Sequence, residues 1–167
     1  MRVLALLGLL TGCGGEGIRS YRVAVDPAPL AALPGSCYRG GTVPSPRVEE
    51  RNLFRDLRWT EWEGQEDRVF LEVDGPAAGW VLGDAPVIRL DGAIAGAEDT
   101  FSAERVTADA SGNMLERVAL RVEFEERGTV SRGTVHLFSG CASCAGGSAL
   151  SCSAQLSFTA REEPLPE

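Results

Sequence analysis

Residues 117–125 read RVALRVEFE, and this stretch decides the fold class. Its apolar residues occupy every second position from Val118 to Phe124, while the residues between them are charged or small. Successive side chains of a strand point to opposite faces, so a period of two places one face in a core and the other in water. Residues 150–161, LSCSAQLSFTAR, repeat the alternation and predict a second strand of the same kind.

Shorter apolar runs predict the remaining strands. They lie at residues 69–73, 88–94 and 135–137, with weaker candidates at 37–41, 57–62, 79–82 and 101–108. Gly, Asn and Asp residues separate the runs at short spacings that suit hairpins. No helical period is sustained, and residues 52–58 suit one helical turn at most. We therefore expect an all-β domain of about eight or nine strands in a single antiparallel meander, as a small closed barrel or a sandwich.

The pairing of neighbouring strands is expected to follow from a two-residue turn at Arg127-Gly128. This turn pairs residues that share the apolar face: Phe124 with Ser131, Leu120 with Val135, and Val118 with Leu137. On the next strand, Val135 is expected opposite Phe158 and Leu137 opposite Leu156. Register and hydrophobic pattern agree in this arrangement.

The composition fits one soluble domain with a tether and excludes several chemistries. The chain has 167 residues, of which 44% are hydrophobic and 24% are charged. All 16 basic residues are Arg, so Schiff-base catalysis and a phosphate-loop lysine are excluded. The net charge of -8 argues against binding to a nucleic-acid backbone, which requires a positive surface.

The N-terminus has the pattern of an export signal. Residues 1–13 read MRVLALLGLLTGC, with one basic residue, a short apolar run and small residues before the cysteine. The apolar run is too short to cross a bilayer, which takes about 20 residues. The stretch Leu10-Thr11-Gly12-Cys13 resembles the lipobox of bacterial lipoproteins.

This resemblance implies that residues 1–12 are a cleaved signal peptide and that Cys13 becomes the acylated first residue of the mature chain. Lipoproteins carry several acyl chains, and two or more chains hold a protein stably on its membrane. Gly14 stands where lipoproteins retained at the inner membrane often carry Asp, which favours the outer membrane. The alternative is an ordinary signal peptide cleaved nearby, which would leave Cys13 as a spare thiol.

Composition also suggests where the folded domain begins and ends. Residues 13–35 are rich in Gly and Pro and are expected to form a flexible, lipid-anchored tether, with an edge strand left open at residues 21–25. The β-domain is expected over residues 36–161. The acidic, Pro-containing tail at 162–167 is expected to be disordered.

Four cysteines remain after Cys13: Cys37, Cys141, Cys144 and Cys152. An even number in an exported chain predicts a disulfide framework, with three possible connectivities. The expected register brings Cys141 opposite Cys152, which leaves Cys144 to pair with Cys37. A bulge would exchange the roles of Cys141 and Cys144. Their spacing also occurs in thiol oxidoreductases, and four cysteines suit zinc. The loop lacks a helix N-terminus to activate a thiol, and exported thiols are usually oxidised before metal arrives, so disulfides are favoured and no metal or cofactor is expected.

No constellation of catalytic residues stands out. His136 is the only histidine, and its position between two apolar residues places it on the surface. The acidic residues at 61–67 lack the ligand spacing of a calcium loop, so a solvated hairpin tip explains them more simply. Trp59 and Trp62 are expected on opposite faces of one strand, with one of them exposed or at the rim of a pocket.

These observations favour a non-enzymatic lipoprotein of the cell envelope. Its disulfide-braced β-domain would work by contact with another envelope component or as a structural element. The strand pattern also resembles lipocalin-like barrels, which implies a carrier of a small apolar ligand, but the Gly-x-Trp signature of that family is missing near the first strand and no binding residues are assigned. A filled interior would argue against a carrier. A hydrolase with paired carboxylates is the third alternative.

Overall fold

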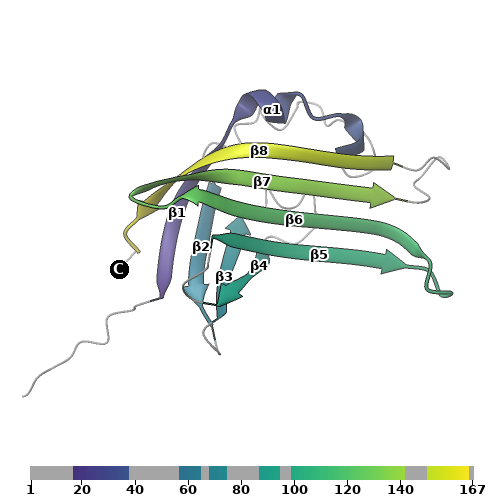
Figure 1. Cartoon of the computed structure of the whole chain (residues 1–167), viewed down its shortest axis with the longest axis horizontal. Helices are drawn as coiled ribbons and strands as arrows, with labels where there is room; N and C mark the ends of the chain where they lie inside the picture. Colours follow the sequence, from purple (N-terminus) through teal and green to yellow (C-terminus); the bar gives the residue numbers. More distant parts are fainter. Residues whose placement is uncertain are drawn as a thin grey trace, which may run out of the picture.

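In the computed structural model of the chain, residues 17–37, 57–64, 68–74, 87–94, 99–141 and 150–165 are described. Across these residues, eight antiparallel strands follow one another in chain order round a closed barrel, which β1 closes by pairing with both β2 and β8 (Figure 1). The strands are β1 (Ile18–Val25), β2 (Leu57–Glu63), β3 (Arg68–Asp74), β4 (Val87–Ile94), β5 (Thr100–Ala108), β6 (Met114–Glu126), β7 (Val130–Cys141) and β8 (Leu150–Glu163). The expected all-β meander of about eight strands is confirmed.

Five aromatic side chains fill the interior of the closed part, and all are buried: Tyr21, Trp59, Phe101, Phe124 and Phe158. The ring centroid of Phe124 lies 5.8 Å from that of Tyr21, 6.4 Å from Trp59, 6.1 Å from Phe101 and 5.2 Å from Phe158. Each such pair contributes about 0.5–1.5 kcal/mol beyond the area that it buries. Phe124, at the end of the alternation that predicts the fold, is therefore a centre of the core.

The strands on one side of the barrel are much longer than those on the other. β6, β7 and β8 have 13, 12 and 14 residues, whereas β2 and β3 have 7 each. β4 and β5 share only two paired positions. The long strands therefore run on beyond the closed part, as Figure 1 shows. Every residue from 104 to 114 is exposed, so the β5–β6 hairpin ends in an arm with water on both faces; we call residues 104–117 the β5–β6 arm.

The expected tether is wrong from Ile18 onward. Tyr21, Val23 and Val25 alternate with exposed residues and point into the core, so β1 is a barrel strand. The chain then forms α1 (Pro27–Ala31), where Asp26 accepts a hydrogen bond from the Ala28 N–H and a proline takes the first turn. A 3-10 helix, η1 (Gly35–Cys37), follows and includes Cys37, while the rest of the strand expected at 37–41 lies outside the described residues.

The other expected boundaries have mixed outcomes. The tail is wrong at its start, because Glu162 and Glu163 belong to β8 and pair with Tyr21 and Ser20 of β1. Strands over 57–62 and 101–108 are confirmed by β2 and β5. The strand at 79–82 falls outside the described residues. Of the helical turn expected at 52–58, Leu57 and Arg58 belong to β2 and the rest lies outside the described residues.

The strand register differs from the expected one by two residues. Phe124 pairs with Gly133 rather than Ser131, and Val135 pairs with Leu156 rather than Phe158. Residues 127–129 separate β6 from β7, and a bulge between Phe124 and Glu126 adds a further offset, so the turn is not a two-residue one. A shift of two keeps every side chain on its face, and for this reason the hydrophobic pattern could not detect it.

Gly133 makes this register sterically feasible. A Cβ at this position would lie 2.0 Å from the Glu123 carbonyl oxygen and 2.8 Å from the Phe158 ring. We expect Gly133→Ala to lower the free energy of unfolding by about 2 kcal/mol, because backbone and core must both shift. Gly128→Ala is the matched control, since its nearest neighbour would be 3.7 Å away, and it should change stability by less than about 0.5 kcal/mol. Urea denaturation measures both, and equal effects would contradict the close approach at Gly133.

Candidate functional site

A buried charge lies at one end of the barrel. Glu61 is the third inward residue of β2, after Leu57 and Trp59, and only 8% of its surface is exposed. A carboxylate in this position is costly unless it is paired and hydrogen-bonded. The expectation of a solvated hairpin tip is therefore wrong for Glu61, while Glu63 is exposed and residues 65–67 lie outside the described part.

Arg127, in the turn between β6 and β7, supplies the pairing charge. Its Nη1 donates to Glu61 Oε2 and lies 3.3 Å from the Tyr21 hydroxyl, while its Nε donates to Asp99 Oδ1 at 3.1 Å. The Tyr21 hydroxyl donates to the same Glu61 oxygen at 3.3 Å. The guanidinium carbon lies 4.1 Å from the centre of the Phe124 ring, so Arg127 covers the aromatic core as well as pairing with Glu61.

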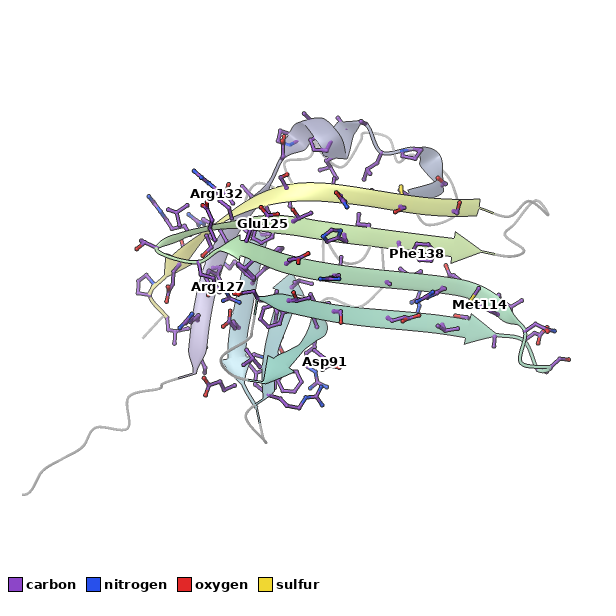
Figure 2. The ribbon with its side chains drawn as sticks, in the orientation of Figure 1. Asp91, Met114, Glu125, Arg127, Arg132 and Phe138 are labelled. Atoms are coloured by element: carbon purple, nitrogen blue, oxygen red, sulfur yellow. A yellow bond between two sulfur atoms is a disulfide. The ribbon has the colours of Figure 1, made fainter. Side chains whose placement is uncertain are left out.

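These residues form a closure for the barrel end, beside an open pocket of about 340 Å³. The pocket is lined by Arg19, Tyr21, Arg127, Gly128, Thr129, Ser131 and Glu162. Figure 2 shows Arg127 at the same end of the barrel as Glu125 and Arg132, and far from Met114 on the arm. Ser131 is buried and its Oγ donates to the Gly128 carbonyl at 3.2 Å, which holds the turn that carries Arg127.

The electrostatics of the closure favour fixed protonation states. Burial, then the charge of Glu61, raises the pKa of Tyr21 above its ordinary value, so the phenol stays protonated at neutral pH. Burial lowers the pKa of Arg127, but the hydrogen bond and charge of Glu61 more than offset this and leave the pKa raised. A neutral phenol and a paired guanidinium stabilise the fold and present no activated nucleophile or base.

The raised pKa of Tyr21 predicts a loss of stability in alkali. Above pH 10 the unfolded chain releases its phenolic proton while the folded chain retains it, so stability is complete below pH 10 and falls as pH rises toward the folded pKa. For one group, the free energy of unfolding falls by at most about 1.4 kcal/mol per pH unit.

Tyr21→Phe should be less stable than the wild type at pH 8 by about 1 kcal/mol, because it lacks the hydrogen bond to Glu61. Its free energy of unfolding should fall less than that of the wild type as the pH rises. Urea midpoints from pH 8 to 11 measure this; parallel curves for the two proteins would contradict it. The chain has no Lys, so few other groups titrate in this range.

The disulfide framework differs from the expected one. Cys37 of η1 is bonded to Cys152 of β8, and the Cα atoms are 4.9 Å apart. The expected Cys141–Cys152 and Cys37–Cys144 pairs are therefore wrong. The two-residue shift in register is the reason, because Cys141 pairs with Leu150 and Cys152 faces Ser139. Cys13 and Cys144 lie outside the described residues.

The other singled-out residues take their expected faces. His136 is on the outer face of β7, where its Nε2 lies 3.2 Å from Glu123 Oε2. Trp59 is buried and Trp62 is half-buried on the opposite face. Among the described residues, none forms a hydrogen bond with the Trp59 indole Nε1, and the ring packs against Phe124 and Phe158. Within the described ranges, no three His, Cys, Asp or Glu side chains gather as a metal site.

Sequence reasoning missed the Glu61–Arg127 pair. The available signal was the alternation of β2, in which Glu61 shares the inward face with Trp59. The partner is 66 residues away in a turn, and no local pattern links the two.

No helix in the described parts of the chain has the length and hydropathy to span a bilayer. Comparison with known proteins adds no relative, since no family model, curated protein or solved structure matches the chain.

Proposed function

We propose that this protein is a lipoprotein of the bacterial cell envelope, acylated at Cys13, whose β-barrel works by contact and catalyses no reaction. The sequence support is the stretch Leu10-Thr11-Gly12-Cys13 behind a basic residue and a short apolar run. Gly14 favours the outer membrane as its location. Cys13 precedes Gly17, the first described residue, by four positions. An acyl anchor on Cys13 would therefore lie close to the start of the barrel.

The observation that carries the contact function is the filled interior of the closed part. The Trp59 and Phe158 ring centroids are 4.9 Å apart, and Phe124 packs against both. Glu61 and Arg127 cover the end of this core. A carrier needs an apolar cavity of several hundred Å³, whereas the described residues of the closed part place aromatic rings in contact with one another across the interior. Contact is therefore better supported than the lipocalin-like alternative.

The β5–β6 arm is the described element best suited to contact. Val106 and Met114 on it are 53% and 48% exposed, and a two-stranded ribbon with water on both faces adds little to barrel stability. Arg117 at its base pairs with Glu104 and lies over Phe138, which fixes the root of the arm to the sheet. A fixed root with exposed apolar side chains on the strands beyond it fits an element that meets another envelope component.

Acylation is tested by Cys13→Ser in cells supplied with radiolabelled palmitate. We expect the wild-type protein to incorporate label and sediment with membranes, and the variant to lose both properties, because the acyl chains supply the attachment at about 0.8 kcal/mol per buried methylene. Label in the variant would refute the anchor. Saturable binding of an apolar fluorescent probe by the mature domain would instead support a carrier.

A further inference from the structure

An apolar row crosses the outer face of the barrel at the end where β1 begins. Ile18 pairs with Trp62, and Trp62 pairs with Phe70, so the three side chains lie side by side on β1, β2 and β3. Ile18 is 48% exposed. The rings of Trp62 and Phe70 are stacked with centroids 4.7 Å apart. These residues alternate with the inward core residues of their strands, so the row adds to the outer surface and contributes nothing to the core.

Two arginines flank this row. The guanidinium carbons of Arg68 and Arg89 lie 5.5 Å and 4.9 Å from the centre of the Phe70 ring. Gly64 makes room for that ring, because a Cβ there would lie 2.4 Å from it. Asp91 offsets part of the charge, with a carboxylate oxygen 3.9 Å from Arg68. We call Ile18, Trp62, Phe70, Arg68 and Arg89 the entry face.

The position of β1 limits how far the entry face can lie from the anchor. Five residue steps separate Cys13 from Ile18, which span at most about 18 Å when fully extended. A tether reaching residue 35, 22 steps from Cys13, would have allowed about 79 Å. The Glu63 N–H donates to the Gly17 carbonyl at 2.9 Å, which fixes the incoming chain beside the last residue of β2. An acylated Cys13 therefore holds this end of the barrel against the bilayer.

We propose that the entry face docks on the phospholipid surface that holds the anchor. Ile18 and the edge of Trp62 enter the interfacial region, where indole rings and aliphatic side chains are favoured. Arg68 and Arg89 meet lipid phosphates, which suits guanidinium groups. This inference rests on the proposed acylation of Cys13. Figure 1 places the start of β1 and the tip of the β5–β6 arm toward opposite ends of the molecule, so the tip of the arm lies away from the entry face.

The test uses the acylated mature protein in vesicles of phosphatidylethanolamine and phosphatidylglycerol that contain brominated lipid, a short-range quencher of indole emission. Ile18→Trp adds an indole to the entry face, and Val106→Trp adds one at an equally exposed strand position on the arm. We expect loss of the added emission for Ile18→Trp and no loss for Val106→Trp. Arg68→Gln with Arg89→Gln in the Ile18→Trp background should weaken the quenching.

The outcomes separate this inference from the proposed function. Acylated protein that floats with the vesicles but shows unquenched Ile18→Trp emission overturns docking alone, and so does equal quenching at both positions. Absence of acylation overturns the anchor and the docking together. Circular dichroism of both tryptophan variants verifies that they retain the barrel.

Discussion

Replacing both Cys37 and Cys152 with serine is expected to lower the free energy of unfolding by about 4–5 kcal/mol. The bond joins residues 115 positions apart. Closing a loop of that length lowers the conformational entropy of the unfolded chain, which corresponds to about 4–5 kcal/mol of stability for the folded protein. Both residues are buried, with Cys37 6% and Cys152 4% exposed. The bridge holds η1 against the part of β8 that β1 does not reach, so its loss also frees the segment after β1.

The measurement is urea denaturation of the wild-type protein and the Cys37→Ser/Cys152→Ser variant, with peptide mapping of the oxidised chain. Cys141→Ser with Cys144→Ser serves as control, and in it the peptide that joins Cys37 to Cys152 should persist. A wild-type map that joins Cys141 to Cys152 would contradict the bridge. A loss of less than 1 kcal/mol in the double variant would contradict its expected contribution.

The sequence predicts the faces of the strands much better than their register. The alternation at 117–125 identifies Val118, Leu120, Val122 and Phe124 as core residues, and all four are buried. Because side chains alternate between the two faces of a strand, the hydrophobic pattern cannot distinguish registers that differ by two residues. The bulge after Phe124 and the close approach at Gly133 decide between equivalent registers, and both depend on contacts between strands. The wrong cysteine pairing follows from this one ambiguity.

The N-terminal boundary failed for a different reason. Gly and Pro density suggests a tether, yet the prolines after Asp26 begin a helix and the alternation at 21–25 closes the barrel. Closure depends on β8, more than 130 residues further on, so local composition carries no sign of it. The same error concealed the entry face, because Ile18 lies beside Trp62 and Phe70 only when β1 pairs with β2.

Removing the positive charge of the barrel closure should be nearly as damaging as removing the disulfide. We expect Arg127→Met to lower the free energy of unfolding by about 4 kcal/mol, because the buried charge of Glu61 then loses its paired cation and keeps the hydrogen bond from the Tyr21 hydroxyl. The side chains of Arg127 and Glu61 are only 21% and 10% exposed. Water therefore screens the attraction between their charges much less than it screens an ion pair on the surface. Methionine retains most of the apolar packing on Phe124, so the loss reports mainly on charge.

A surface pair in the next strand provides the control for that experiment. Arg132 and Glu126 are 3.5 Å apart with both side chains 67% exposed, so Arg132→Met should cost less than about 1 kcal/mol. Adding Glu61→Leu to Arg127→Met should recover part of the loss, because an apolar pair leaves no buried charge. Equal effects of Arg127→Met and Arg132→Met in thermal and urea denaturation would mean that the closure is a surface contact, and the barrel end would then be open to water.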